Sequence, residues 1–283
     1  VITMKIKHLL VALISTATLF SCNNQQKTTT ILKQNDFPAP PVAEIAPDTF
    51  IHFGNTRIDN FFWMKDKNNP KVIDYLNAEN AYTDTVMSST KDLQAKIYDE
   101  IIGRIKEDDQ SYPTLRNGYY YYSRTEKGKQ YATNCRKKGS LEAEEEIIFD
   151  VNKMAEGKSA YIFSGYSVSP DNSKAAYFYN ETGSFAEYIL KIKDLTSGNE
   201  LDFSVKGATS VGWANDNKTL FYGTIDPVTL RPYQVYRQVI GSGEKQLVYE
   251  EKDARFNTSV SSSKTREWIL ISSGSSTTSE VRL

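Results

Sequence analysis

The chain has 283 residues and a formal net charge of −1, from 34 Lys and Arg against 35 Asp and Glu. Such a balance argues against a nucleic-acid partner, because binding to the phosphate backbone relies on excess positive charge. Aromatic residues make up 12% of the chain, which favours β-strands, whose half-buried surfaces accommodate large rings. The only cysteines are Cys22 and Cys135. Two cysteines are too few for a disulfide framework or a Cys/His zinc motif, and lipidation of Cys22, argued below, would leave Cys135 without a partner.

Residues 1–22 have the composition of a lipoprotein-type signal peptide. Lys5 and Lys7 precede the apolar run of residues 9–20, which is shorter than the roughly 20 residues of a membrane-spanning helix. Residues 19–22 read LFSC and resemble a bacterial lipobox. We expect cleavage before Cys22 and lipidation of its thiol, which would make the protein an exported bacterial lipoprotein of the cell envelope, held on the membrane. An ordinary signal peptide and an uncleaved anchor remain alternatives.

Residues 23–47 are predicted to be a flexible linker. They are rich in Asn, Gln, Thr and Pro, with prolines at positions 38, 40, 41 and 47. A segment of this composition buries too little apolar surface to fold, and its prolines keep it extended. It would serve as a tether between the membrane and a globular body.

Residues 48–109 are predicted to form a helical segment. One helix is expected to begin at Asn69-Pro70, because proline is well tolerated in the first helical turn. A second helix is expected to carry one apolar face at steps of four residues, although Gly103 weakens a helix by about 1 kcal/mol relative to Ala. The residues of that face are Leu93, Ile97, Ile101 and Ile105.

Residues 110–283 change to short strands with turns between them, and part of this pattern repeats. The turn segments 169–174, 213–218 and 261–264 each precede a strand with aromatic or branched residues, at intervals of about 45 residues. Units of this length with several short strands are typical of propeller blades. The fold class is therefore mainly β: an incomplete β-propeller of about four blades, preceded by the N-terminal α-helical segment.

Several stretches resemble the oligopeptidase B branch of the prolyl oligopeptidase family of serine peptidases. They are residues 52–66, 69–80, 103–109, 117–124 and 135–140. The resemblance implies a seven-bladed propeller, of which about four blades are present. It implies that residues 48–109 pack on a C-terminal α/β-hydrolase domain that would lie beyond Leu283. It also implies that the propeller admits short peptides and that cleavage follows Arg or Lys, with the Pro-specific branch as the neighbouring possibility.

We expect no catalytic residue within the chain. A Ser-His-Asp triad requires an imidazole base, and the two histidines are His8, in the signal peptide, and His52, in the helical segment. A Gly-x-Ser-x-Gly nucleophile elbow is absent, and the nearest sequence, around Ser167, ends in Ser169. The parent would be a serine-type endopeptidase, whereas this chain alone is predicted to be inactive.

Other candidate sites have structural interpretations. Residues 171–173 and 215–217 offer oxygen ligands but lack the Gly and distal Glu of an EF-hand loop, so they are interpreted as Asx turns. Residues 241–245 are too short for a P-loop and indicate a hairpin turn. Cys135 is expected in the core. Neither a cofactor nor a metal is therefore expected.

The acidic run of residues 142–146 lies opposite the basic residues 136–138. We interpret it as a solvated loop between strands, with a contact for basic peptides as the alternative.

Two functions fit the pattern. The first is the N-terminal part of a serine oligopeptidase, with short peptides as substrates. The second is a lipid-anchored, non-catalytic propeller that acts as a scaffold. The helical segment favours the enzyme, because a self-contained propeller has no use for it. In that case the apolar face of the second helix should be incompletely buried.

Overall fold

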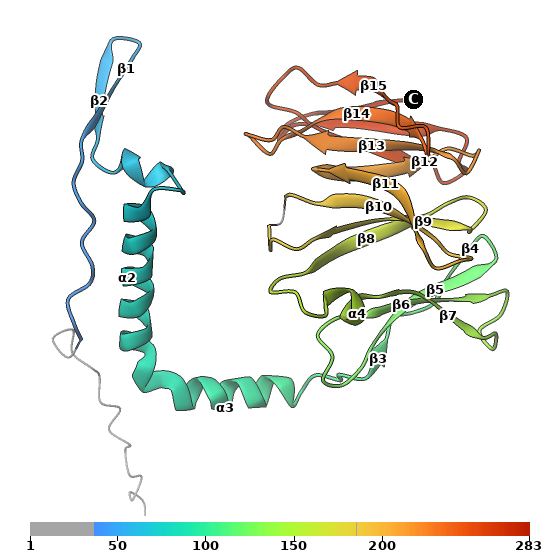
Figure 1. The fold of residues 1–283 in the computed structure, drawn as a ribbon, viewed down its shortest axis with the longest axis horizontal. Coiled ribbons are helices and arrows are strands. Elements are labelled where there is room, and N and C mark those ends of the chain that lie inside the picture. Colours follow the sequence, from blue (N-terminus) through green and yellow to red (C-terminus); the bar gives the residue numbers. More distant parts are fainter. Residues whose placement is uncertain (1–36, 185) are drawn as a thin grey trace, which may run out of the picture. The chain divides into compact units, whose positions relative to one another are not determined.

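The computed structural model describes residues 37–184 and 186–283. The chain divides into two compact units, residues 1–104 and 105–283, whose elements are labelled in Figure 1. The predicted signal peptide, Cys22 and most of the predicted linker lie outside the described residues. Among the helices that are described, none is long and apolar enough to cross a bilayer.

The first unit begins with a β-hairpin that the sequence did not reveal. Strands β1 (Asp48–His52) and β2 (Asn55–Asp59) pair in antiparallel fashion. The turn residues Phe53 and Gly54 have φ angles of 48° and 76°, as a type I′ turn requires at both central positions. Phenylalanine rarely adopts this conformation, which is why the turn was not recognised. The predicted helical segment therefore contains a hairpin before its helices.

Two helices follow, and the first begins where the sequence indicated. After η2 (Phe62–Lys65), helix α2 (Pro70–Met87) starts with Asn69 as its N-cap, whose side-chain oxygen accepts from the backbone N–H of Lys71 at 3.0 Å. After η3 (Ser88–Thr90), helix α3 (Lys91–Ile102) ends at Gly103. The predicted continuation to Ile105 is wrong, because glycine readily ends a helix.

The last residues of the predicted linker are attached to the first unit. The indole N–H of Trp63 donates to the backbone carbonyl of Glu44 at 3.0 Å. The Glu44 carboxylate lies 2.7 Å from the ammonium group of Lys71, and the N–H of Ala46 donates to the carbonyl of Asn60 at 3.0 Å. A free tether would therefore end before Glu44 instead of at residue 47.

The second unit contains four antiparallel sheets, and its first sheet includes the end of the predicted helical segment. The strand order of this sheet is β3-β5-β6-β7, and β4 also pairs with β5. Because Asp109 already belongs to β3, the change from helices to sheets comes earlier than residue 110. The bounds are β3 (Asp109–Gln110), β4 (Thr114–Arg116), β5 (Tyr119–Thr125), β6 (Thr133–Lys138) and β7 (Glu145–Asp150), followed by α4 (Val151–Ala155).

The next three sheets each run in sequence order through antiparallel neighbours. The second sheet has β8 (Ile162–Val168), β9 (Lys174–Asn180), β10 (Ile189–Asp194) and β11 (Glu200–Lys206). The third has β12 (Ala208–Trp213), β13 (Thr219–Ile225), β14 (Pro232–Val239) and β15 (Lys245–Glu250). The fourth has β16 (Asn257–Ser262), β17 (Ile269–Gly274) and β18 (Ser279–Arg282). This series of sheets confirms the predicted incomplete propeller of about four blades.

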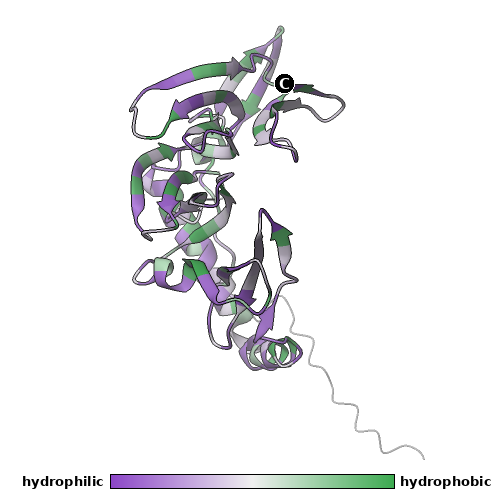
Figure 2. Cartoon of the chain, turned by 90° about the vertical axis from the view of Figure 1, so that its right-hand side faces the viewer, coloured by the Kyte–Doolittle hydropathy of each residue, from purple (hydrophilic) through white to green (hydrophobic). Residues whose placement is uncertain are grey.

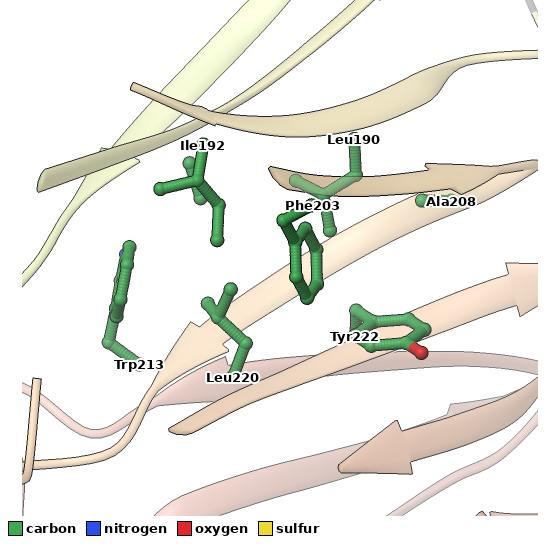
Figure 3. Close-up of a cluster of buried hydrophobic side chains, with 8 residues drawn as sticks. Leu190, Ile192, Phe203, Ala208, Trp213, Leu220 and Tyr222 are labelled. Atoms are coloured by element: carbon green, nitrogen blue, oxygen red, sulfur yellow. The ribbon is translucent and has the colours of Figure 1, made fainter. Parts of the chain in front are cut away.

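The hydrophobic core lies between neighbouring sheets. Hydrophobic and hydrophilic residues alternate along many strands in Figure 2, because successive side chains point to opposite faces. Phe149 of the first sheet packs against Tyr177 of the second, with ring centroids 4.9 Å apart. Leu190 and Leu220, both fully buried, belong to a cluster between the second and third sheets (Figure 3).

Candidate functional site

The turns β4–β5, β8–β9, β12–β13 and β16–β17, one in each of the four sheets, are built alike. Each turn contains one residue other than glycine in the left-handed region. Asparagine tolerates this conformation better than most residues, because its short polar side chain can form local hydrogen bonds. The four residues are Asn117 (φ 48°), Asn172 (61°), Asn217 (58°) and Arg266 (64°). The predicted repeat therefore corresponds to equivalent turns in successive sheets.

Side-chain amides in these turns connect each sheet to the next. In each case an amide of one turn bonds to the backbone of a neighbouring turn. These hydrogen bonds therefore hold adjacent sheets together at the ends where the turns lie. The bonds run from Asn172 Nδ2 to the Asn117 carbonyl at 3.0 Å, from the Asp171 N–H to Asn217 Oδ1 at 2.9 Å, and from Asn215 Nδ2 to the Arg266 carbonyl at 2.7 Å.

Arg136 on β6 reinforces the connection between the first two sheets. Its side chain is only 6% exposed, and its guanidinium donates to Glu146 at 2.7 Å and to the backbone carbonyl of Asn172 at 2.8 Å. The guanidinium carbon also lies 4.3 Å from the centroid of the Tyr119 ring. A buried charge with such complete pairing has a structural role.

The acidic run of residues 142–146 is consequently only partly a solvated loop. Glu145 and Glu146 belong to β7 and are half-buried, and Glu145 accepts from the Tyr122 hydroxyl at 2.6 Å and from Arg124 at 3.2 Å. Glu142 and Glu144 are exposed. The carboxylates of Glu145 and Glu146 are already paired within the sheet, so they are poor contacts for a basic peptide.

The first strands and their turns line a cavity of about 1410 Å³ in the second unit. Three cationic residues, Arg116, Lys264 and Arg266, contribute to its lining, whereas no Asp or Glu does. Much of the remaining wall consists of aromatic and hydroxyl side chains, among them Tyr121, Tyr166 and several serines. The cavity therefore offers aromatic surface, hydrogen-bonding groups and positive charge.

The aromatic side chains of this wall are fixed by hydrogen bonds. The Tyr121 hydroxyl donates to Asn172 Oδ1 at 3.0 Å, and the Trp213 indole N–H donates to the Ser167 carbonyl at 3.0 Å. Burial raises the pKa of the Tyr166 hydroxyl to about 12, which places this ring in the desolvated part of the wall. The lining is therefore arranged before any ligand enters, which favours binding.

The serine and histidine considered from the sequence belong to different units. Ser167 lies on β8 and lines the cavity, while residues 105–283 contain no histidine. His52 ends β1 of the first unit, where it is exposed with its ring centroid 4.3 Å from that of Phe53. The structure thus brings no imidazole to Ser167 within the second unit.

The remaining sequence candidates have the structural roles assigned to them. Cys135 is 0% exposed, and burial raises the pKa of its thiol to about 11.

The Ser173 N–H donates to Asp171 at 3.0 Å and the Lys218 N–H donates to Asp216 at 2.9 Å, which confirms the Asx turns. Residues 241–244 lie in the turn of the β14–β15 hairpin, and Lys245 begins β15. The described residues contain no cluster of three or more potential His, Cys, Asp or Glu metal ligands.

The cationic residues of the cavity were missed at the level of sequence. Arg116 directly precedes the Asn117-Gly118 turn, and Lys264 and Arg266 lie in the turn after β16. An alignment of the repeat units on these turns would have shown that Arg116, Lys264 and Arg266 occupy equivalent regions at the same end of their sheets. A single basic residue in a loop does not by itself indicate a binding site, because such residues are usually solvated on the surface.

Comparisons with known proteins identify the family. Residues 40–283 match the model of the prolyl oligopeptidase N-terminal beta-propeller domain. The chain is 37% identical over 249 residues to dipeptidyl aminopeptidase BI of Pseudoxanthomonas mexicana, covering 81% of this chain and 34% of that protein. It is 32% identical over 253 residues to Protease 2 of Moraxella lacunata, covering 86% of this chain and 36% of that protein.

Solved structures agree with this assignment. Oligopeptidase B from Leishmania major superposes with a TM-score of 0.79 at 30% identity, over 86% of this chain and 37% of that chain. Oligopeptidase B from Trypanosoma brucei superposes with a TM-score of 0.78 at 30% identity, also over 86% of this chain and 37% of the other. The chain thus spans about a third of the length of these relatives. It belongs to the prolyl oligopeptidase family and carries the N-terminal propeller part of that family.

Proposed function

We propose that this chain is the substrate-admitting part of a serine oligopeptidase that hydrolyses short peptides after Arg or Lys. The catalytic triad would lie in a C-terminal α/β-hydrolase domain outside these 283 residues. The observation that carries the proposal is the cavity of about 1410 Å³ along the inner strands of a peptidase-family propeller.

The dimensions of the cavity support a filter for peptide size. It exceeds the roughly 300–1,000 Å³ of ordinary small-molecule sites, so an extended peptide segment fits. A folded domain of 100 residues has a radius of gyration of about 13 Å, and its volume is several times that of the cavity. A folded domain of this size would therefore not enter the cavity whole.

The first unit supports the presence of a hydrolase domain in the parent protein. On α3, Leu93 is 57% exposed, Ile97 is 47% exposed and Ile101 is 54% exposed. The expected incomplete burial of this apolar face is observed. A hydrolase domain packed on the face would remove it from water, whereas a scaffold propeller offers no reason for the face.

The relatives suggest a second candidate for the reaction. The relative that is 37% identical is named a dipeptidyl aminopeptidase, which indicates removal of dipeptides from a free N-terminus. Chromogenic Arg-Arg substrates with free and with acetylated N-termini distinguish the two reactions. An endopeptidase accepts both substrates, whereas a dipeptidyl aminopeptidase requires the free amine.

We also propose that the parent is a lipoprotein anchored through Cys22, on the basis of the sequence LFSC at residues 19–22. Metabolic labelling with palmitate should mark the protein in a bacterial host, and Cys22→Ser should abolish the label. Labelling that survives this substitution would contradict the proposal.

The activity itself is tested by expressing this chain together with the coding sequence that continues it. The longer protein should cleave a peptide containing an Arg-X bond and leave the same bond intact within a folded protein. The 283-residue chain alone should show no turnover. Turnover by the chain alone, or a continuation without Gly-x-Ser-x-Gly, Asp and His, would overturn the proposal, and the latter would support the scaffold function.

A further inference from the structure

We propose that the cavity of the second unit selects peptides by a carboxylate, which Arg116, Lys264 and Arg266 attract and bind. This inference deepens the proposed function and rests on it, because it takes a peptide as the ligand. It adds that the admitting part distinguishes peptides by charge as well as by size.

The sign of the charge on the cavity wall carries the argument. The lining contains Arg116, Lys264 and Arg266 and no carboxylate. Within the described residues none of the three forms an ion pair. Charges of one sign in a concave, low-dielectric wall reinforce one another's potential and raise the local concentration of the opposite charge. The chain as a whole has a net charge of only −1, so this positive potential is a local property.

The acidic residues of the neighbouring turns do not enter the cavity lining. Asp171 accepts from the Ser169 hydroxyl at 2.6 Å, and Asp216 accepts from the Thr219 hydroxyl at 2.6 Å. Both carboxylates are thus held by hydrogen bonds within their own turns. Glu146 is paired with Arg136, and neither of them lines the cavity. The N–H groups of Arg116, Lys264 and Arg266 are therefore not engaged by these carboxylates and can donate to a ligand.

The position of Arg266 suits a carboxylate in particular. When the Asn117 amide is oriented with its oxygen towards Arg266, that oxygen accepts from Nη1 at 2.7 Å and also from Nη2. A guanidinium has five N–H donors in a planar fork, so this contact fixes the group and leaves donors free. Arg116 precedes Asn117 in the chain, and both residues line the cavity, so a second guanidinium is available to the ligand.

The carboxylate can come from the C-terminus of a peptide or from an acidic side chain. Three peptides separate these sources: acetyl-Phe-Gly-Gly as the free acid, the same peptide as the amide, and acetyl-Phe-Glu-Gly amide. Binding to the 283-residue chain is measured by isothermal titration calorimetry. Because this requires no turnover, a failure of the inference is distinguishable from a failure of the proposed hydrolysis.

We expect the free acid to bind about tenfold more tightly than the amide at low ionic strength, and the difference to shrink in about 1 M salt, where the Debye length falls to about 3 Å. Tighter binding of acetyl-Phe-Glu-Gly amide would assign the preference to side-chain carboxylates. Equal binding of all three peptides, or binding of none at millimolar concentration, would overturn the inference.

The variant Arg116→Gln/Arg266→Gln, which keeps Lys264, should remove most of the difference in affinity between the acid and the amide and leave the amide unaffected. Lys264→Gln, at an exposed position, should give a smaller loss and serves as the second variant if the double variant does not fold. Arg237→Gln is the matched control, because Arg237 is exposed on β14 and outside the cavity lining. A loss in the control equal to that in the double variant would also overturn the inference.

Discussion

The sheets of the second unit and helix α3 of the first unit differ in how far their apolar side chains are buried. Leu190 is 0% exposed and Tyr222 is 1% exposed, whereas Leu93 is 57% exposed and Ile101 is 54% exposed. The sheets bury their central apolar residues against one another, so each sheet supplies a covering surface for the next, whereas outer positions such as Ile147 and Leu247 stay about half exposed. The apolar face of α3 has no such surface among the described residues of its unit.

This difference indicates which part of the chain is stable by itself. The cores between sheets come from residues far apart in sequence, and their burial provides the main stabilising free energy. Helix α3 has 12 residues, and isolated helices shorter than about 12–15 residues are marginal in water. We therefore expect the sheets to fold without help and α3 to depend on a further partner.

The largest effect is expected in the core between the second and third sheets. Leu190→Ala should lower the free energy of unfolding by about 2–5 kcal/mol, because it removes buried methyl groups and leaves a cavity. Leu93→Ala on α3 is the matched control, and it should change stability by less than about 0.5 kcal/mol. Urea unfolding followed by near-UV circular dichroism measures both, and equal effects would remove the distinction between the two regions.

A smaller effect is expected from the ion pair that joins the first two sheets. Glu146→Gln should destabilise the second unit by about 1–3 kcal/mol, because the buried guanidinium of Arg136 loses its counter-charge. Glu100→Gln removes the partner of Arg104 in an exposed pair, for which we expect about 0–1 kcal/mol. The same urea titration compares them. A larger loss for the exposed pair would contradict the structural role of Arg136.

The pH dependence of stability should also originate in the sheets. Burial raises the pKa of Tyr222 to about 12, above the usual value of about 10. The folded protein therefore holds this proton more tightly, so its contribution to stability is complete below about pH 10 and is lost between about pH 10 and pH 12. Tyr222→Phe should make the decrease of unfolding free energy over this interval shallower. An unchanged slope would show that Tyr222 is not protected by the core.

The smallest effect on the isolated chain is expected from the face of α3. Ile97→Gln should leave its stability within about 0.5 kcal/mol of the original, because Ile97 is 47% exposed. In the proposed longer protein the same change should weaken the packing of a hydrolase domain and increase proteolysis near α3. Unchanged proteolysis of the longer protein would indicate that this face is not a docking surface.

The repeated turns were the part of the fold that the sequence defined best. Asp171 and Asp216 occur in equivalent local motifs, and their Asx turns depend on neighbours within three residues. Asn69-Pro70 also identified the start of α2, where the structure shows a local cap hydrogen bond from Lys71 N–H to Asn69. Such features are predictable because the chemistry that forms them lies within one short segment.

Features that depend on distant residues or uncommon conformations could not be predicted. The turn at Phe53 uses a positive φ that aromatic residues seldom adopt. The sequence placed the acidic run opposite residues 136–138, but the specific pairing of Glu146 with Arg136 follows only from the register of β6 and β7. The cavity cations Arg116 and Arg266 are separated by 150 positions and meet only after the turns have been placed. The candidate site therefore emerged from the fold and not from any motif.

Hydrogen–deuterium exchange on the 283-residue chain tests the contrast between the two regions most directly. Amides of β9, β10 and β13 should exchange slowly, through opening of the cores between sheets, whereas amides of α3 should exchange orders of magnitude faster. In the proposed longer protein, packing of a hydrolase domain should protect α3 while the sheets change little. Protection of α3 equal to that of β13 in the 283-residue chain would contradict the account.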